Sequence, residues 1–375
     1  MTKDFVVTPW NVSGNIDYEK LIRDFGVKSI DDSLLKRIEK HTGNLHHFLT
    51  RKIFFAHTYL DTLLNDFEKK NKFYLYTGRA PSGPVHLGHM TPWIFCKWLQ
   101  DKFGATLLFQ IPDEEKFLFN DNLTLDDTKK WAYENILDII ATGFDPKKTK
   151  IFLDTEYSGM MYKHACRVAK KVTFSTAKST FGFTDSNNLG QIFYTCMQSV
   201  PAFLPSILEN KPTNCLIPCA IDQQPHFFMT NDVAPKLGYP KPSTILSRFL
   251  PGLGGIQQEG KMSSSILNTS IFMTDNPKQV RTKIMKYAFS GGKDTIDEHR
   301  KHGGNPEVDV AYQYLTFFLE DDKKLKQIYD DYKSGKLLSG ELKQIAVDVI
   351  NHELESHQKR REKAKHDIEK FMLRD

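Results

Sequence analysis

The chain has 375 residues, of which 40% are hydrophobic and 26% charged, and its formal net charge is +5. These values are ordinary for a globular protein and argue against extended disorder. No stretch approaches the roughly 18 apolar residues of a membrane-spanning helix, and the first residues lack the long apolar region of a secretory signal. We therefore expect a cytoplasmic protein with no membrane contact and two or three structural units. The small positive charge permits a nucleic-acid partner without establishing one.

The five cysteines are scattered, odd in number and without Cys-x-x-Cys spacing, which favours free thiols over disulfides. Cys215 and Cys219 are spaced like metal ligands, but they lie in an apolar, strand-like run. We interpret them as structural thiols.

Residues 1–70 are expected to form an appended layer and not a separate domain. The segment around Val6–Val12 resembles a short hairpin, because its β-prone residues surround a Pro-Trp-Asn stretch. Helical patterns follow at 18–25, 33–41 and 55–69.

From residue 71 strand and helix patterns alternate, in the order strand 73–78, helix 87–103, strand 106–111, helix 126–141 and strand 150–154. Such alternation predicts the α/β class, with a parallel sheet covered by helices on both faces. We expect a Rossmann-like domain over 71–270.

The alternation stops over 155–205 and resumes with a strand at 215–219, which predicts an insertion between two halves of the sheet. Beyond 271 only helical periodicity appears, so 271–375 is expected to be an all-helical domain. Its apolar stripe comprises Leu342, Ile345, Val349, Ile350 and Leu354. The basic cluster that follows is, taken alone, typical of a solvated helix face, and comprises Lys359, Arg360, Arg361, Lys363 and Lys365.

His86 and His89 stand where the strand 73–78 gives way to the helix 87–103. Free backbone N–H groups and the positive end of the helix dipole favour an anion there, and Gly88 permits close approach to the backbone. Taken alone, the pair could equally be a packing corner or half of a zinc site.

Lys261 begins a Lys-Met-Ser-Ser-Ser stretch in a loop rich in glycine. Alone this loop would be a solvated segment. Its fixed cation and its hydroxyl donors, combined with the histidine corner, predict a site for the phosphates of ATP.

The two motifs resemble the signatures of class I aminoacyl-tRNA synthetases, and their surroundings resemble the tryptophanyl-tRNA synthetases of the eukaryotic cytosolic type. The matching segments span nearly the whole chain: Thr8-Pro9-Trp10, Tyr74-Leu75-Tyr76-Thr77-Gly78-Arg79, Asp113-Glu114-Glu115-Lys116, Ile217-Pro218-Cys219-Ala220-Ile221-Asp222-Gln223 and Ala288-Phe289-Ser290-Gly291-Gly292. So many ordered matches are more specific than either signature alone.

The resemblance implies a ligase that activates L-tryptophan with ATP and transfers it to the terminal adenosine of tRNA(Trp). It implies catalytic roles for His86, His89, Lys261 and Ser263 at the phosphates. Further nucleotide contacts are implied for Arg79, Gly88, Lys116, Met262 and Ser264. A Mg²⁺ ion bridging the phosphates is expected, but such an ion needs few protein ligands, so no metal-binding residue is predicted.

For tryptophan, the resemblance places Tyr76, Gln110 and Glu115 at the indole, with Gln198 and Gln223 at the amino and carboxylate groups. Tyr76 and Gln110 also stand at the carboxyl ends of predicted strands, where open α/β sheets bind ligands. A buried amide at Gln110 needs a partner, and a structural bond to backbone is the alternative. Without the resemblance, Glu115 would be a surface acid.

Three further expectations come from the resemblance. The insertion 155–205 carries the contact of a homodimer, for which Met160, Met161 and Phe174 are suitable, although a monomer's own core is the alternative. The helical domain contacts the tRNA anticodon. Ser264 replaces the second lysine of the commoner Lys-Met-Ser-Lys-Ser motif, which leaves any role for that cation in doubt.

Three other functions remain open from the sequence. A tyrosine-specific synthetase shares the nucleotide fold. A small-molecule nucleotidyltransferase also uses His-x-Gly-His, but the lysine loop and the helical C-terminal region argue against it. A synthetase-derived binding protein without catalysis is opposed by the intact His86, His89 and Lys261.

Overall fold

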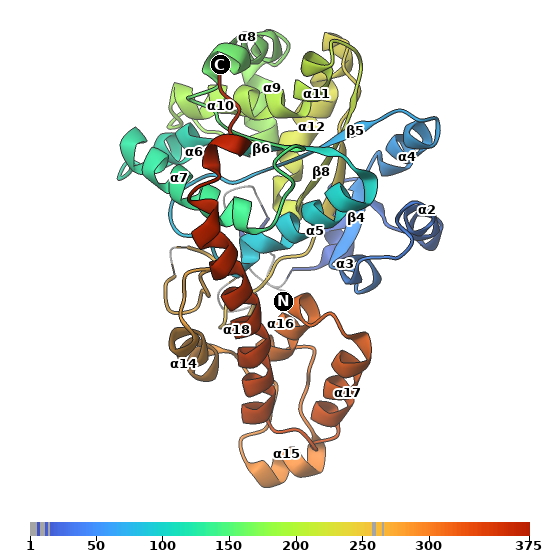
Figure 1. Cartoon of the computed structure of the whole chain (residues 1–375), viewed down its shortest axis with the longest axis vertical. Helices are drawn as coiled ribbons and strands as arrows, with labels where there is room; N and C mark the ends of the chain where they lie inside the picture. Colours follow the sequence, from blue (N-terminus) through green and yellow to red (C-terminus); the bar gives the residue numbers. More distant parts are fainter. Residues whose placement is uncertain (1–5, 8–11, 14–15, 257–259, 265) are drawn as a thin grey trace.

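A seven-stranded sheet forms the centre of the computed structural model, which describes residues 6–7, 12–13, 16–256, 260–264 and 266–375 (Figure 1). Its strands run in the order β3-β4-β9-β8-β5-β6-β7, and a separate two-stranded sheet joins β1 to β2. The strands are β1 (Val6–Val7), β2 (Val12–Ser13), β3 (Lys28–Ser29), β4 (Phe54–Thr58), β5 (Phe73–Gly78), β6 (Thr106–Ile111), β7 (Thr149–Leu153), β8 (Asn214–Ala220) and β9 (Ser243–Ser247).

Helices surround the sheet and form the whole lower part of the molecule in Figure 1. They are α1 (Tyr18–Asp24), α2 (Asp32–Thr42), α3 (His47–Thr50), α4 (Leu60–Glu68), α5 (Leu87–Phe103), α6 (Asp113–Phe119), α7 (Leu125–Ala141), α8 (Ser158–Ala169), α9 (Phe174–Phe181), α10 (Leu189–Ser199), α11 (Leu204–Leu208), α12 (Gln224–Val233), α14 (Pro277–Tyr287), α15 (Ile296–His302), α16 (Val310–Phe318), α17 (Asp322–Lys333), α18 (Ser339–Ala364) and α19 (Ile368–Phe371). None of the helices in the described residues combines the length and the apolar character needed to cross a bilayer.

The five strands from β9 to β7 are parallel, which confirms the predicted sheet. Alternate residues of each strand face opposite sides. On β6, Leu107 and Phe109 join the core formed with α5 and α7, whereas Leu108 joins a second core with α8 and α10. The sheet is therefore the middle of three layers, and Gln110 lies on the same face as Leu108.

The predicted helix over 55–69 is wrong in its first part. Residues 54–58 form β4, which pairs antiparallel with β9 and with β3, and α4 begins only at Leu60. Tyr59 between them has a φ of 53°, a left-handed conformation that interrupts both elements. Four consecutive buried residues, Phe54 to His57, are typical of a strand covered on both faces. Part of the N-terminal segment thus extends the main sheet.

The predicted hairpin is present as β1 and β2, although Thr8-Pro9-Trp10 lie outside the described residues. The insertion is present as α8, α9 and α10, and all five cysteines are free. Strand β9 was not anticipated from the sequence. The domain boundaries at 70 and 270 remain a prediction.

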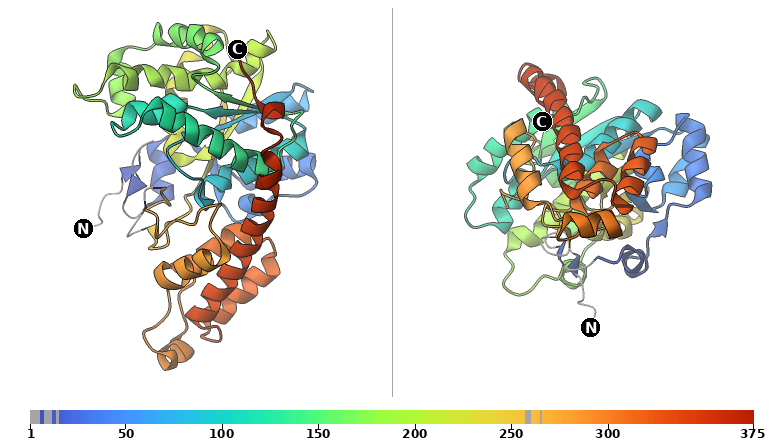
Figure 2. Two further views of the ribbon diagram at one scale, coloured as in Figure 1. Left: turned by 60° about the vertical axis from the view of Figure 1, so that its left-hand side comes forward. Right: turned by 90° about the horizontal axis from the view of Figure 1, so that it is seen from below.

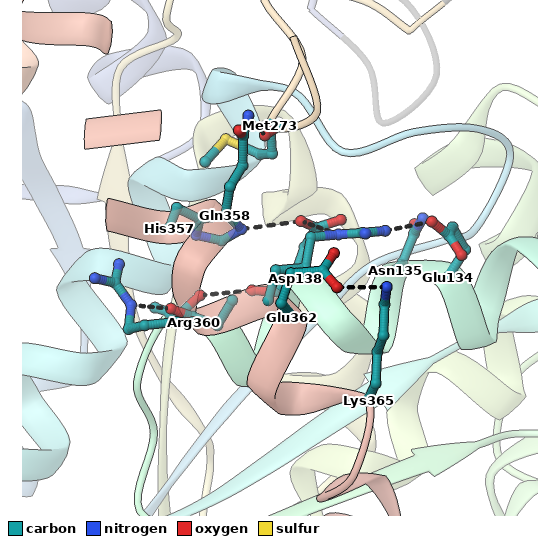
Figure 3. Close-up of polar contacts among 12 residues, drawn as sticks. Glu134, Asn135, Asp138, Met273, His357, Gln358, Arg360, Glu362 and Lys365 are labelled. Carbon is teal, nitrogen blue, oxygen red and sulfur yellow. Dashed lines mark hydrogen bonds and ion pairs between the residues drawn. The ribbon is translucent and has the colours of Figure 1, made fainter. Parts of the chain in front are cut away.

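Helix α18 spans both parts of the molecule, running from the helical lower region up to the sheet (Figures 1 and 2). Its carboxyl half packs against α7 through a buried polar cluster (Figure 3). Arg361 donates to Asp138 at 3.0 Å and also pairs with Glu134, while His357 contacts Asp138 at 2.9 Å. The expected solvated basic face is therefore wrong for Arg361, which is 8% exposed.

The chain end returns to the sheet layer. Leu373 donates its backbone N–H to the carbonyl of Ile151 on β7, at 2.7 Å. The side chain of Asp375 accepts from the backbone N–H groups of Gly159 and Met160, at 2.6 and 2.9 Å, at the start of α8. The last residues of the helical region are thus fixed to the α/β region.

Candidate active site

A cavity of about 620 Å³ lies where the parallel strands β5, β6, β8 and β9 end. Ligands of open α/β sheets bind at this edge, because the loops that follow the strands converge there. Every predicted site residue lines the cavity: Tyr76, Arg79, His86, Gly88, His89, Gln110, Glu115, Lys116, Gln198, Gln223, Lys261, Met262, Ser263 and Ser264. Residues separated by the insertion and by two strands are thus brought together.

His86 and His89 form the start of α5 and stack with their ring centroids 3.6 Å apart. The backbone N–H of Gly88 donates to Nδ1 of His86 at 3.1 Å, and the backbone N–H of His86 donates to Nδ1 of His89 at 3.2 Å. Because each Nδ1 accepts a bond, the proton of each neutral ring resides on Nε2. Each ring therefore offers one N–H donor.

Both rings are uncharged at neutral pH. Burial lowers the pKa of His86 and of His89 well below the usual value, and the nearby charges of Arg79 and Lys261 lower both pKa values further. Burial disfavours any charge on the rings, whereas the two nearby cations favour an anion at this corner.

The lysine loop is held against the histidine corner. Ile271 accepts from the backbone N–H of Leu87 at 3.0 Å, and Met273 donates to the carbonyl of Val85 at 2.9 Å, so that the segment after the loop pairs with the corner. A Cβ at Gly88 would lie 3.0 Å from a ring carbon of His86 and 3.5 Å from Cβ of Met262. A side chain at position 88 would therefore crowd the His86 ring.

Lys261 reaches into the cavity and pairs with Asp222, at the end of β8. Its ammonium group also lies 5.7 Å from the ring centroid of Phe249. The hydroxyl of Ser264 donates to the carbonyl of Pro84 at 3.3 Å, and the carbonyl of Ser263 accepts from Ser270 at 2.7 Å. Ser265 lies outside the described residues.

Arg79 is a buried cation, 9% exposed, whose Nε and Nη2 have no hydrogen-bond partner among the described residues. Burial lowers the pKa of Arg79 to about 10, so it remains charged at neutral pH. A buried guanidinium with two unused donors is suited to a bound anion.

A second part of the cavity wall is a series of buried polar side chains joined by hydrogen bonds. The hydroxyl of Tyr76 donates to Oε1 of Gln110 at 2.5 Å and accepts from Nε2 of Gln198 at 3.0 Å. Tyr194 contacts Oε1 of Gln198 at 2.6 Å and Glu115 at 3.1 Å. The side chain of Gln110 thus bonds to other side chains in the described residues, and not to backbone as in the alternative prediction.

Glu115 is part of this wall and not a surface acid, with 14% of its side chain exposed. Burial alone would raise the pKa of Glu115, but several favourable interactions, led by the ion pair with Lys116 at 2.9 Å, together outweigh burial and leave the pKa below the usual value. The carboxylate therefore remains charged inside the cavity.

Sequence reasoning did not single out Asp154, Tyr194 or Asp222. Asp154 directly follows the buried strand β7, and a polar residue in that position was a usable signal. Tyr194 is in the insertion, whose approach to the sheet no local pattern reveals. Asp222 was part of a matching segment but had no assigned role.

Comparison with known proteins points to the same family as the two sequence motifs. The model of the family described as "tRNA synthetases class I (W and Y)" matches residues 68–355. Tryptophan–tRNA ligase of Saccharolobus solfataricus is 52% identical, over 99% of this chain and 96% of the relative. The cytoplasmic human tryptophan–tRNA ligase is 51% identical, over 99% of this chain and 81% of the relative.

The chain belongs to the tryptophan–tRNA ligase family. It is therefore a class I aminoacyl-tRNA synthetase, as the resemblance implied. Solved tryptophanyl-tRNA synthetases share its fold. That of Plasmodium falciparum has a TM-score of 0.89 at 43% identity, over 95% of this chain and 97% of the other. That of Encephalitozoon cuniculi, bound to tryptophan, has a TM-score of 0.88 at 37% identity, over 96% and 99%. Among tryptophan–tRNA ligases this chain is similar to archaeal and human members to nearly the same degree.

Proposed function

We propose that the cavity at the carboxyl ends of β5, β6 and β8 binds ATP and L-tryptophan side by side and joins them into tryptophanyl-adenylate. The tryptophanyl group then passes to the terminal adenosine of tRNA(Trp). The observation that carries this assignment is that one cavity has two unlike walls. One has the neutral histidine pair with Arg79 and Lys261, and the other has the buried amides and hydroxyls with Glu115 and its partner Lys116.

The first step needs no protein nucleophile. The carboxylate of tryptophan attacks the α-phosphorus of ATP and pyrophosphate leaves, so the protein must align the reactants and neutralise charge on the phosphates. Nε2–H of His86 and of His89 would donate to phosphate oxygens. Arg79 has two unused donors at the same wall, and Lys261 with Ser263 would hold the departing pyrophosphate.

Lys261 would exchange its partner during this step. Its ion pair with Asp222 places the ammonium group at the cavity, where a phosphate with more charge would compete for it. Within the described residues no cluster of three potential metal ligands is present. A Mg²⁺ ion would arrive with the phosphates of the nucleotide and keep several of its waters.

Asp222 is the residue that would contribute to holding such an ion, because its Oδ1 is buried without a hydrogen-bond partner in the described part of the chain. When bound, the ion supplies positive charge to the triphosphate. Ser264, Met262 and Lys116 would complete the nucleotide side, and Gly88 leaves room for close approach.

Tryptophan selection requires an acceptor for the indole N–H, which can only donate. Oε1 of Gln110 accepts from Tyr76 and keeps a second lone pair, and Glu115 lies along the same wall. Gln198 and Gln223 would bind the amino and carboxylate groups. A site built on such bonds rejects analogues that lack them by about 10⁴ to 10⁵, so no editing domain is needed.

Amino-acid-dependent exchange of pyrophosphate into ATP tests the proposal. Exchange that depends on tryptophan, and not on tyrosine, is expected. Dependence on tyrosine would overturn the specificity, and exchange without any amino acid would favour a nucleotidyltransferase. Binding of tRNA without adenylate formation would favour a non-catalytic protein.

The helical region, residues 271–375, would contact the tRNA anticodon. Because α18 packs on α7, deletion after residue 270 would expose the core beneath α7. Loss of activity in such a protein would therefore not separate anticodon contact from damage to the α/β region. Charge reversals at exposed positions of α17, such as Lys323→Glu, leave the core intact. They should weaken transfer to tRNA without altering pyrophosphate exchange.

A homodimer formed through the insertion is the expected assembly. Met161 is fully buried in the chain's own core and cannot provide this contact, whereas Phe174, Tyr162 and Leu189 are 50%, 59% and 85% exposed. Light scattering should give twice the monomer mass, and Leu189→Asp should lower it. We also propose a cytoplasmic location, which the human relative's name supports.

A further inference from the structure

We infer that Asp154 is a specificity-determining positioning residue, which fixes the amide of Gln110 so that its oxygen faces the amino-acid site. Asp154 does not line the cavity and would not touch tryptophan. It lies behind Gln110, and the inference rests on the proposed role of Gln110 as acceptor for the indole N–H.

The geometry gives the amide one orientation. Nε2 of Gln110 donates to Oδ2 of Asp154 at 2.7 Å, which leaves Oε1 to accept from Tyr76. Asp154 is 1% exposed and Gln110 fully buried, so water cannot replace either bond. Without an acceptor at position 154, the amide could turn and present its NH₂ group to the cavity.

The hydrogen bonds of Tyr76 agree with this orientation of the Gln110 amide. The Tyr76 oxygen accepts from Nε2 of Gln198, so the single hydroxyl proton of Tyr76 is free to go to Gln110. If the Gln110 amide turned, its NH₂ would face this hydroxyl and Tyr76 would lose its acceptor. Asp154 therefore sets the direction of the bonds from Gln110 through Tyr76 to Gln198.

Glu114 is a neighbouring carboxyl group that acts electrostatically on Asp154. Burial raises the pKa of Asp154 well above its usual range, and the charge of Glu114 raises it further. Burial raises the pKa of Glu114 to about 8. Oδ2 of Asp154 is the acceptor for Gln110, and an asparagine in its place offers an acceptor without charge.

The test compares two substrates that differ only at the indole nitrogen. β-(3-Benzothienyl)alanine carries sulfur where tryptophan carries the N–H, and the ratio of kcat/KM for the two in pyrophosphate exchange reports the acceptor. Asp154→Val removes the acceptor and fills the position with a slightly larger, apolar side chain. We expect the preference for tryptophan to fall about tenfold or more, with the KM for ATP unchanged.

Two matched variants separate positioning from general damage. Asp154→Asn keeps the acceptor and should retain the preference to within about threefold. Glu114→Gln changes the neighbouring carboxyl group but not the bond from Gln110 to Asp154. This variant should also retain the preference for tryptophan. If Asp154→Val does not fold, Asp154→Ser replaces it, because the serine oxygen is too short to keep the 2.7 Å contact.

A folded Asp154→Val or Asp154→Ser protein with the full preference for tryptophan would overturn the inference, as would an equal loss in Asp154→Asn. If the unaltered protein itself does not distinguish the two substrates, then the proposed role of Gln110 fails. The role of Asp154 can be refuted separately, because that result requires an unaltered protein that does distinguish the two substrates.

Discussion

The ammonium group of Lys261 is ion-paired with the carboxylate of Asp222, although the two residues are 39 positions apart. The pair joins the lysine loop to the end of β8, and 34% of the Lys261 side chain remains exposed. The cation of the proposed phosphate site is thus held at the cavity by the fold itself.

Replacing Lys261 by alanine should slow pyrophosphate exchange about 100- to 1000-fold, because one preorganised contact to the departing phosphates is lost. The KM for tryptophan should change little. Lys283→Ala is the matched control, since Lys283 is also paired with an aspartate, Asp275 at 2.6 Å, but does not line the cavity. Equal losses in both variants would contradict a direct role for Lys261.

Replacing Gln110 by alanine should raise the KM for tryptophan at least about tenfold more than the KM for ATP, because the indole N–H loses its acceptor. Steady-state pyrophosphate exchange measures both constants. Gln100 provides the control, because it is also a buried glutamine but bonds to Thr149 outside the cavity. Equal effects of Gln110→Ala on both substrates would refute the assignment.

Removing Arg361 should destabilise the protein by about 3 kcal/mol, because Asp138 loses a buried, charged partner. Urea denaturation at neutral pH measures the change in the free energy of unfolding. Lys359→Ala removes only an exposed pair with Glu355 and should cost less than about 1 kcal/mol. A similar small effect for Arg361→Ala would show that the contact between α7 and α18 is not held by this cluster.

His226 should make the protein less stable as the pH falls. Burial lowers the pKa of His226 to about 4, whereas the unfolded chain titrates near 6.5. Between these values the unfolded state binds the proton and the folded state does not. The contribution of His226 to stability is therefore fully present above pH 6.5 and is lost as the pH falls toward 4.

The measurement for His226 is urea denaturation at pH 7 and pH 5. Between pH 7 and pH 5, the free energy of unfolding of His226→Gln should fall by about 2 kcal/mol less than that of the unaltered protein. Replacement of the exposed His366 by glutamine is the control and should change nothing. Parallel losses in the unaltered protein and His226→Gln would contradict the assignment.

Local patterns predicted the part of the site that stands on regular elements. The apolar run of β6 placed Gln110 near a strand end, and the turn before α5 placed His86 and His89 at a helix start. The helix prediction was wrong for residues 55–58, because a strand buried on both faces lacks alternation and resembles a helix segment. The pairs Tyr194 with Glu115 and Lys261 with Asp222 depend on how the insertion and the loop return to the sheet, which no single segment encodes.

A crystal structure with L-tryptophan and a non-hydrolysable ATP analogue tests the central claim most directly. The account predicts the phosphates within hydrogen-bond distance of His86, His89 and Lys261, and the indole N–H against Oε1 of Gln110. Phosphates bound away from these residues, or an indole ring outside the wall formed by Tyr76 and Gln110, would contradict it.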